Sequence, residues 1–548
     1  MNDNGKMRAL LSYWHKKLFF GMIGLLAAGN ILAQNRIPMT PEAADAAFGR
    51  KAVCRPLPET QLLSHPEEEF LYAVGKRHAT AIAVEQEAET VLTAEGMRLY
   101  RIGFESPGAT FMDLSFDRFH LPAGSHALLY HPESRLCKGP YLPEEIHDSL
   151  GFSTDLLPGD RIVLLCAVPA ASADSLRIAL RCVIAGTQSF FNSGETPSCL
   201  INTACEEAAP YHDLVQSVVL IYMDGYLCSG TLLNNTAQDG TPYILTAAHC
   251  MEEIAYPRYG SWKFYFNIAS RSCVSNSNGP TLNDLDLQSM TGCQLVAKGE
   301  NSDFLLLKLN RKVPEGFNAY YSGWDRRNQA AQQGVAGIHH PKGDYKKISL
   351  SSQVPVTDNC AGVGFNRKAF WRFFWTQGMA FQGSSGSGLF DSQSKRLVGT
   401  LTAINDVTCE SSVDRRLCWY GKLSYHWFAN NESDSSKQLR PWLDPLQSGV
   451  LYLEGSYLRS LAQPGPAEAE PPLRLYPNPA AEELTLLWQE ECGGAAEICS
   501  ISGQRLLQFP LQPGENRIAI GQLAAGIYLL RAGSAQSSCC LRFTVIRP

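Results

Sequence analysis

Residues 243–250 read YILTAAHC, an apolar run that delivers His249 directly before a cysteine. Two later segments combine a strand-like run with a chemically active side chain in the same way. Residues 301–309 read NSDFLLLKL, with Asp303 at the head of an apolar run, and residues 383–390 read GSSGSGLF, with serines in a glycine-rich turn. Short apolar runs bounded by turn residues predict strands, so these segments place a histidine, an aspartate and a serine at strand ends.

Together, these three residue types can perform nucleophilic catalysis. A serine hydroxyl is a weak nucleophile until a histidine takes its proton, and the histidine needs a buried carboxylate that fixes its tautomer. Glycines around the serine allow backbone N–H groups to point at a developing oxyanion. Hydrolases with such a triad occur with several residue orders, and the order His, Asp, Ser is that of the chymotrypsin-like double β-barrel.

Each segment also has a simpler explanation. A GSSGSG run is typical of a flexible linker, an aspartate often begins a strand, and His249 beside Cys250 could be half of a metal site. No second pair of ligands follows at the spacing of a zinc finger. The order and the spacing of the three segments together favour the catalytic interpretation.

The composition limits the class of protein. The chain has 548 residues, 45% of them apolar and 18% charged, which excludes a disordered or collagen-like chain. At about 150 residues per domain, this length predicts three or four domains. A net charge of −6 argues against a nucleic-acid partner, which usually selects a basic surface. Seventeen cysteines without any CxxC pair indicate an oxidising compartment, and many short alternating runs predict an all-β protein.

The N-terminus predicts a cleaved signal peptide over residues 1–33. Basic residues precede the apolar stretch from Leu18 to Ala33, and Ala33 offers a small residue to signal peptidase. A membrane anchor is the alternative. The apolar stretch is shorter than a membrane-spanning helix, which needs about 20 residues.

Linkers divide the rest of the chain. Residues 34–192 predict a β-sandwich, followed at 190–197 by a polar linker that is a candidate processing site. Residues 198–457 contain the three catalytic segments, and a Pro/Glu/Ala-rich linker at 458–472 leads to a small second sandwich at 473–548. The clearest strands predicted in the first sandwich are Thr80–Val84, Met97–Ile102, His126–Tyr130, Arg161–Val168 and Leu176–Ile184. Its four cysteines are enough for two disulfides of open connectivity: Cys54, Cys137, Cys166 and Cys182.

The middle region carries further motifs in a fixed order. They are CSGTLLNNT at 228–236, TAAHC at 246–250, SDF at 302–304, GWDRR at 323–327, IHHP at 338–341, GSSGS at 383–387 and WLDP at 442–445. With these motifs, residues 199–455 resemble the lysyl endopeptidase branch of the chymotrypsin-like serine peptidases. The resemblance implies two six-stranded barrels with the active site between them, His249 as the base, Asp303 as the residue that orients it and Ser385 as the nucleophile. It also implies an oxyanion hole at Gly383 and Ser385, and neither a metal nor an organic cofactor.

Adjacent histidines, His339 and His340, raise the question of a metal site. Neighbouring side chains on a strand point to opposite faces, which argues against both binding one ion. The resemblance makes them structural residues near the cleft.

Two features depart from related enzymes. Ser384 precedes the nucleophile, where trypsin-like enzymes have an aspartate that pairs with the new amino terminus, so activation through that ion pair is not expected; lysyl endopeptidases share this difference. In the S1 pocket, the lysine-binding aspartate of the family corresponds to Cys418, a pocket tryptophan to Cys360 and a pocket histidine to Thr402. These residues predict an apolar or small P1 residue, on the acyl side of the cleaved bond, rather than lysine.

The resemblance implies three disulfides: Cys199–Cys409, Cys205–Cys273 and Cys228–Cys250. We expect a fourth between Cys360 and Cys418, because one bridge would explain why two pocket positions are both cysteine. Two separate buried thiols are the alternative, since a buried cysteine behaves as a small hydrophobic side chain. Strict cleavage after lysine would instead mean that another acid, Asp414 or Asp406, serves the pocket. The pairing of the cysteines in the last region stays open: Cys492, Cys499, Cys539 and Cys540.

The last region, with LYPNP at 475–479, ISGQ at 501–504 and LAAGIY at 523–528, resembles the C-terminal sorting domain of the type IX secretion system of Bacteroidota. A generic binding sandwich is the alternative. The ending, CCLRF at 539–543, departs from the usual lysine-rich form. The resemblance implies export across the outer membrane by that machinery, to the cell surface or the medium.

The sequence therefore predicts a secreted, monomeric serine endopeptidase that is made as a precursor with an N-terminal pro-domain and acts on proteins or peptides. The rival is a surface adhesin or binding protein built on an inactive peptidase fold. The intact set of His249, Asp303 and Ser385 argues against the rival, and the altered S1 pocket is the feature in its favour.

Overall fold

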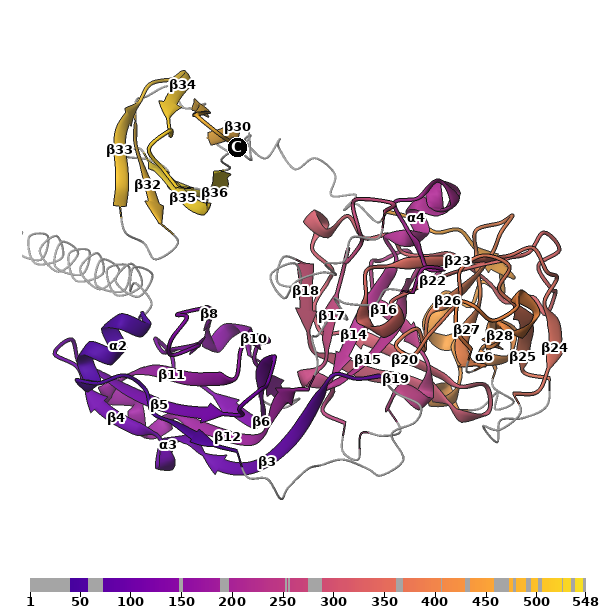
Figure 1. Cartoon of the computed structure of the whole chain (residues 1–548), viewed down its shortest axis with the longest axis horizontal. Helices are drawn as coiled ribbons and strands as arrows, with labels where there is room; N and C mark the ends of the chain where they lie inside the picture. Colours follow the sequence, from indigo (N-terminus) through magenta and orange to yellow (C-terminus); the bar gives the residue numbers. More distant parts are fainter. Residues whose placement is uncertain are drawn as a thin grey trace, which may run out of the picture. The chain divides into compact units, whose positions relative to one another are not determined.

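The computed structural model describes most of the chain between residues 40 and 545. The described ranges are 40–57, 72–146, 151–187, 197–251, 254, 257–274, 288–360, 368–405, 407–428, 434–457, 473–476, 480–488, 494–500, 505–524, 526–533 and 538–545. Residues 41–459 form one compact unit and the C-terminal region belongs to another (Figure 1). Strands dominate both units, which confirms the all-β prediction. The predicted signal peptide and Asp406 lie outside the described residues.

The N-terminal region is a two-layer sandwich (Figure 1). One sheet has the order β1-β5-β11-β7-β8 with β4 also on β5, and the other has the order β10-β6-β12-β3 with β9 also on β6. The first sheet contains β1 (Cys54–Pro56), β4 (Glu89–Leu92), β5 (Met97–Glu105), β7 (His126–Tyr130), β8 (Cys137–Tyr141) and β11 (Arg161–Pro169). The second contains β3 (Gly75–Ala83), β6 (Phe111–His120), β9 (Phe152–Ser153), β10 (Leu157–Pro158) and β12 (Arg177–Gly186). The strands predicted from the sequence are therefore present as β3, β5, β7, β11 and β12.

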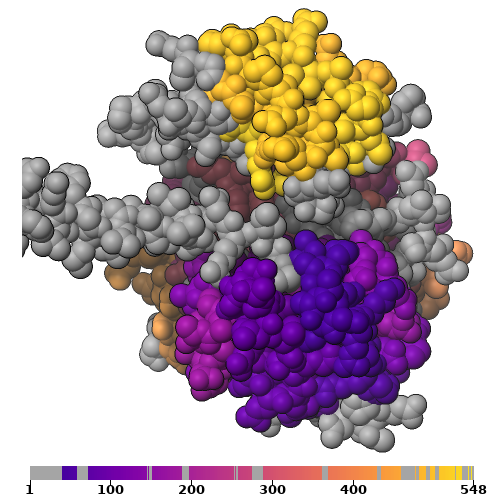
Figure 2. All heavy atoms as spheres, turned by 90° about the vertical axis from the view of Figure 1, so that its left-hand side faces the viewer, coloured from indigo at the N-terminus to yellow at the C-terminus, as the bar shows by residue number. Residues whose placement is uncertain are grey.

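Apolar side chains from both sheets meet in one core, which includes Phe104 and Leu164 from the first sheet and Leu114 and Phe116 from the second. In the space-filling view, the indigo and purple residues of the sandwich form one continuous body (Figure 2). Two short helices, α2 (Pro41–Phe48) and α3 (Val84–Glu87), belong to the same region.

The four cysteines of the sandwich are free thiols, so the two disulfides that they could have formed are absent. Cys54 and Cys137 lie on β1 and β8, at opposite edges of one sheet. Cys166 packs inside the sandwich core, whereas Cys182 on β12 belongs to a different cluster outside it. The two sheets therefore keep these sulfur atoms on different edges and faces.

The first half of the middle region is a closed barrel. Its strands follow the order β18-β17-β14-β15-β16-β20-β19, and only Gly292 separates β18 from β19, so the two ends of the sheet are one bent strand. The strands are β14 (Val218–Met223), β15 (Tyr226–Leu233), β16 (Tyr243–Thr246), β17 (Lys263–Tyr265), β18 (Ser289–Thr291), β19 (Cys293–Gly299) and β20 (Phe304–Leu309).

The second half repeats this topology. Strands β22, β23, β25, β26, β27 and β28 occur in the order β23-β22-β26-β27-β28-β25, and a bridge between Leu350 and Gln377 joins β23 to the segment after β25. The main strands are β22 (Val335–His339), β23 (Lys347–Ser351), β25 (Phe370–Phe374), β26 (Gly388–Asp391), β27 (Leu397–Ile404) and β28 (Leu417–Lys422). Short strands add to this sheet: β13 (Ile201–Asn202), β21 (Trp324–Asp325), β24 (Val356–Asp358) and β29 (Tyr452–Leu453). Short helices are α4 (His212–Val215), α6 (Leu423–His426) and α7 (Arg440–Leu443). The predicted pair of six-stranded barrels is therefore present.

The sandwich packs directly on the outer face of the first barrel. Strand β14 is buried at all six positions, since its side chains alternate between two apolar environments. Val219 and Ile221 point into the barrel core, whereas Leu220 and Tyr222 pack outside it against Phe111 of the sandwich. A barrel strand with one face in water would alternate apolar and polar residues, so the continuous apolar run of β14 reflects coverage by the sandwich.

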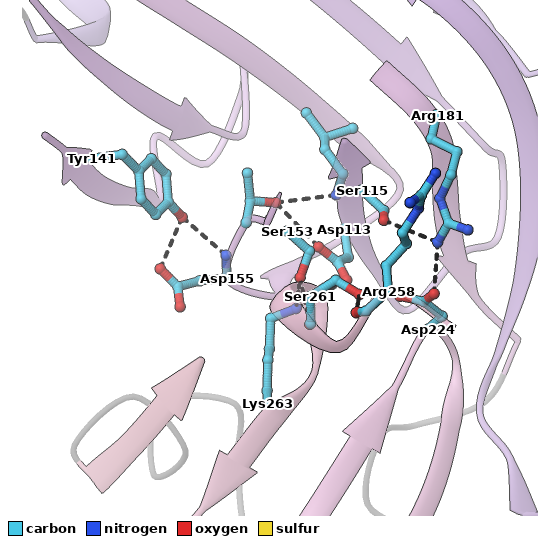
Figure 3. A network of polar contacts seen from close by, with 12 residues as sticks. Asp113, Ser115, Tyr141, Ser153, Asp155, Arg181, Asp224, Arg258, Ser261 and Lys263 are labelled. Atoms are coloured by element: carbon cyan, nitrogen blue, oxygen red, sulfur yellow. Dashed lines mark hydrogen bonds and ion pairs between the residues drawn. The ribbon is translucent and has the colours of Figure 1, made fainter. Parts of the chain in front are cut away.

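A buried polar network crosses the same interface (Figure 3). Lys263 of the barrel pairs with Asp113 of the sandwich at 3.3 Å and also bonds to Ser153. Arg181 of the sandwich pairs with Asp224 of the barrel at 2.6 Å. Buried charges are stable only when they are paired, so these contacts fix the register between the two domains.

One short strand of the N-terminal region enters the barrel sheet. Strand β2 (Tyr72–Ala73) pairs antiparallel with the first two residues of β15, Tyr226 and Leu227. The chain then continues through Val74, whose N–H donates to the carbonyl of Gly225 at 2.8 Å, into β3 of the sandwich. The two domains are thus joined by a continuous extended segment.

The C-terminal unit is a small sandwich, as predicted. One sheet contains β30 (Leu473–Tyr476), β31 (Glu483–Trp488) and β34 (Gly514–Ala519) in the order β30-β31-β34. The other has the order β33-β32-β35-β36 and contains β32 (Gly494–Ser500), β33 (Arg505–Leu511), β35 (Gly526–Gly533) and β36 (Ser538–Val545). Trp488 and Phe543 are among the side chains that fill the core between the sheets. Among the described residues, no helix has the length and apolar character needed to cross a membrane.

Candidate active site

His249 lies on a short helical turn that begins two residues after β16. The turn, η5 (Ala248–Met251), is tied to β15 by the disulfide between Cys228 and Cys250, whose Cα atoms are 6.4 Å apart. His249 is nearly buried, with 7% of the residue exposed. The barrel thus presents the histidine from a rigid, cross-linked position.

Asp303 is fully buried and holds His249 at two points. Its Oδ2 lies 2.7 Å from the Nδ1 of the His249 ring, and its Oδ1 accepts a hydrogen bond of 2.8 Å from the backbone N–H of His249. Asp303 directly precedes β20 and has a φ of 60°, in the left-handed region. The two contacts fix the ring with Nδ1 as the protonated nitrogen, which leaves Nε2 unprotonated and able to accept a proton.

Ser385 comes from the second barrel, in the turn before β26, and this turn is pressed against the first barrel. The N–H of Ser229 on β15 donates to the carbonyl of Ser385 at 2.8 Å, and the Ser229 hydroxyl donates to the carbonyl of Gly383 at 2.9 Å. A Cβ at Gly386 would lie 2.0 Å from the Oγ1 of Thr246 and 2.8 Å from the N of Ala247. Only glycine fits there, at a φ of 80°, so the turn abuts the chain two residues before His249.

The structure therefore brings the three predicted residues to one junction between the barrels. His249 and Asp303 come from the first barrel, and Ser385 comes from the second. Within the described part of the chain, the N–H groups of Gly383 and Ser385 have no hydrogen-bond partner, as donors for an oxyanion require.

Sequence reasoning missed two residues that support the site. Ser229 joins the two barrels through its backbone and its side chain. It lies in the CSGTLLNNT motif, which was the signal in the sequence that could have pointed to it. His426 is fully buried, with its Nδ1 2.9 Å from the hydroxyl of Ser302, the residue before Asp303. Burial lowers the pKa of His426 to about 3, so its ring is neutral.

The predicted disulfide between Cys360 and Cys418 is wrong, because both residues are free buried thiols. Strand β25 lies between β24 and β28, and Cys418 pairs with Phe373 of β25 whereas Cys360 follows the pair formed by Asp358 and Phe370. Two strand spacings of about 4.8 Å therefore separate the strands that lead to the two cysteines, and Cys418 lies a further three residues of about 3.3 Å along the sheet from the level of Asp358. A disulfide needs Cα atoms within about 7 Å.

The three predicted S1 residues lie in different surroundings. The Cys418 thiol is 3.5 Å from the carbonyl of Phe373, in an apolar cluster that also contains Met379 and Trp375. Burial raises the pKa of Cys418 well above its ordinary value, so this position carries no charge. Cys360 belongs to another cluster, and Thr402 is buried at an irregularity of β27.

The three disulfides implied by the resemblance are present. They are Cys199–Cys409, Cys205–Cys273 and Cys228–Cys250. His339 and His340 bind different groups: Nδ1 of His339 lies 2.9 Å from the Ser384 hydroxyl, and Nδ1 of His340 lies 2.8 Å from the carbonyl of Asp344. Among the described residues, no group of three or more His, Cys, Asp or Glu side chains forms a metal site.

The sequence matches two families of known domains. Residues 193–421 match the family described as "Lysyl endopeptidase, C-terminal domain", and residues 474–546 match "Secretion system C-terminal sorting domain". A curated lysyl endopeptidase of Pseudomonas aeruginosa is 31% identical over 252 residues, which cover 44% of this chain and 50% of that protein. The chain thus spans about half the length of this relative.

Solved structures of proteases resemble part of the chain. The Rv3671c protein from M. tuberculosis H37Rv is 12% identical, with a TM-score of 0.27 over 42% of this chain and 90% of that chain. Kallikrein-related peptidase 10 is 17% identical, with a TM-score of 0.28 over 40% of this chain and 94% of that chain.

The two sequence matches fall on the two regions singled out by their motifs. A C-terminal sorting domain indicates export to the cell surface or the extracellular space. The resemblances read from the sequence are confirmed: residues 193–421 are similar to the lysyl endopeptidase domain family, and residues 474–546 are similar to the secretion sorting domain family.

Proposed function

We propose that this protein is a secreted serine endopeptidase that hydrolyses peptide bonds in proteins through His249, Asp303 and Ser385. The observation that carries the proposal is the pair of contacts from the buried Asp303 carboxylate to His249, at 2.7 Å and 2.8 Å. A buried carboxylate that binds both the ring and the backbone of one histidine is the arrangement that orients an imidazole to act as a general base. The glycine-bounded turn next to the first barrel supplies Ser385 as the nucleophile for this histidine.

The chemistry follows from this geometry. His249 Nε2 takes the hydroxyl proton as Ser385 Oγ attacks the carbonyl carbon, and the N–H groups of Gly383 and Ser385 stabilise the oxyanion. When the C–N bond breaks, the imidazolium gives its proton to the leaving amine, and an ester remains on Ser385. Water then attacks that ester with His249 as the base again, which releases the acid and restores the serine. Asp303 stays ionised and stabilises the imidazolium in both halves.

The S1 pocket is proposed to accept an apolar or small P1 residue. Cys418 stands where lysyl endopeptidases have their lysine-binding aspartate, and it is a neutral thiol beside Met379 and Trp375. Met379 and Ala380 belong to the same cluster and lead directly into the nucleophile turn. Asp414, an alternative acid, is exposed on the short turn η11 (Val413–Arg415).

The N-terminal sandwich, residues 34–192, is proposed to be a pro-domain that blocks substrate binding. From Ala73 to Tyr72, β2 runs along β15 toward Ser229, the residue whose N–H holds Ser385. Ser229 lies two residues beyond Leu227, about 7 Å along the strand. A substrate bound in an extended conformation, with its chain continuing from the nucleophile in this direction, would pair with the same edge of β15. Strand β2 of the pro-domain therefore competes with the substrate for that edge.

The proposed cell biology follows from the two ends of the chain. Residues 1–33 act as a signal peptide, and residues 473–548, after the linker at 458–472, deliver the protein to the type IX secretion machinery. The natural partners are protein or peptide substrates, with the enzyme acting as a monomer and without a metal or organic cofactor.

A catalytically inactive adhesin on the same fold is the second candidate, and the lost pocket charge at Cys418 is the observation in its favour. A fluorophosphonate probe distinguishes the two, because it reacts only with an activated serine. The enzyme proposal requires labelling of the secreted protein and none of the Ser385→Ala variant. A folded, processed protein that takes no label would support the adhesin.

A further inference from the structure

The residue between the two oxyanion donors is anchored in the protein interior. Ser384 is fully buried, and its hydroxyl accepts a hydrogen bond of 3.2 Å from the N–H of Phe381. Its own N–H donates to the carbonyl of Phe381 at 2.9 Å, and its carbonyl accepts from the N–H of Ser387 at 3.1 Å. Hydrogen bonds of Ser384 with Phe381 on one side and with Ser387 on the other therefore close the loop that contains Ser385.

The anchor of Ser384 is His339. This residue ends β22 and is fully buried, with Nδ1 2.9 Å from the Ser384 hydroxyl and Nε2 3.0 Å from the hydroxyl of Ser349 on β23. Both ring nitrogens are thus engaged, one by the nucleophile turn and the other by the neighbouring strand of the barrel. The imidazole links the turn to the rigid sheet.

The ring is neutral in this position. Burial, reinforced by the charge of Lys347, lowers the pKa of His339 to about 3. A neutral imidazole has one donor and one acceptor nitrogen, so the chain from Ser384 through His339 to Ser349 has a direction. When the proton is on Nε2, Ser384 donates to Nδ1 while it accepts from Phe381, and Nε2 donates to Ser349.

We propose that His339 is a positioning residue for catalysis: it holds Ser384, and through Ser384 it holds the N–H groups of Gly383 and Ser385 in the conformation that binds the oxyanion. The proposal rests on the proposed peptidase function. It assigns to a neutral histidine the task that an ion pair with a new amino terminus performs in trypsin-like enzymes. Assembly of the turn therefore needs no proteolytic cleavage, and the pro-domain controls access alone.

The test is steady-state kinetics of the secreted protein with His339→Phe, which keeps a ring of similar volume and removes both nitrogens. Loss of one oxyanion donor typically lowers kcat by about 10²–10³-fold, and a loss of this order is expected with KM changed little. Ser384→Ala removes the hydroxyl that contacts Nδ1 of His339, and it replaces His339→Phe as the test variant if His339→Phe does not fold. The double variant should be no slower than the slower single variant, because the two residues act as one unit.

The matched control is Tyr321→Phe in the peptidase domain. Tyr321 is also buried, at 6% exposure, and its hydroxyl donates to the carbonyl of Gly240 at 3.2 Å, so its replacement reports the generic effect of removing a buried hydrogen bond from this domain. Its kcat should equal that of the wild type. Folded His339→Phe or Ser384→Ala variants with wild-type kcat, or losses that multiply in the double variant, would overturn the inference. An inactive wild type would instead refute the proposed function.

Discussion

At the scale of single residues, the proposed catalysis depends on how Asp303 and His249 are joined. The carboxylate uses one oxygen for the ring and the other for the backbone, so the ring can neither rotate nor exchange tautomers without losing a contact. A substitution at position 303 that replaces one of these acceptor oxygens by a donor should therefore impair His249 as the base without unfolding the domain.

The corresponding variant is Asp303→Asn. The amide can present only one acceptor oxygen, which favours the wrong tautomer of His249, and kcat should fall by up to about four orders of magnitude, the loss typical of this substitution in a serine-protease triad. His249→Ala should abolish activity. Steady-state kinetics with a peptide substrate measure both effects, and thermal unfolding checks that each variant is folded. An Asp303→Asn enzyme with near-wild-type kcat would show that the orientation of His249 does not matter.

A second residue-scale prediction concerns specificity. Because Cys418 is an uncharged thiol, cleavage should favour apolar or small P1 residues over lysine. Cleavage-site profiling of a peptide library by the secreted protein measures this preference directly. A strict preference for lysine would refute the assignment of the pocket and point to another acid, such as the exposed Asp414.

At the scale of elements, the sequence predicted the strands well where they carry apolar runs. The barrels and the three disulfides were implied by the family resemblance, which rests on motifs that are local in the chain, and the triad stays a prediction. The bridge between Cys360 and Cys418 could not be judged, because it depends on β25 lying between the two cysteines. The packing of the sandwich on the first barrel was not predicted either. The apolar residues at every position of β14 nevertheless indicated that this strand is buried on both faces.

The interface of the sandwich predicts a pH-dependent pro-domain. Burial raises the pKa of Asp113 to about 7, with Lys263 opposing the shift. Separation from the barrel removes part of this burial, so the pKa of the carboxyl falls toward its ordinary value of about 4. Docking therefore takes up a proton between these values, so this contribution is fully present below about pH 4 and is lost as the pH rises through about 7.

The measurement uses a full chain with a specific protease site placed in the linker at 190–197. After that linker is cut, the sandwich should stay bound and inhibitory at pH 5 and dissociate more readily at pH 8, as followed by size exclusion and peptidase activity. Asp113→Asn, which does not titrate, is the matched control and should remove most of the difference. Equal retention of the wild-type sandwich at both pH values would contradict the role of Asp113.

At the scale of the whole molecule, the chain joins a covered peptidase domain to an export domain. Deletion of 473–548 should leave transport into the periplasm intact and prevent export beyond the outer membrane, because the sorting domain is then missing. Immunoblots of periplasm, cell surface and medium measure the distribution. Normal surface or medium levels of the truncated protein would show that this domain is not needed for export.

The central claim is that peptide bonds are cleaved through an ester on Ser385, and trapping of that ester tests it most directly. The secreted protein is mixed with an activated ester of an apolar amino acid, quenched in acid and analysed by peptide mapping with mass spectrometry. We predict the acyl group on Ser385 in the wild type, accumulation in His249→Ala at a much slower rate, and none in Ser385→Ala. A Ser385→Ala variant that hydrolyses peptides at the wild-type rate, or an acyl group on another residue, would contradict the claim.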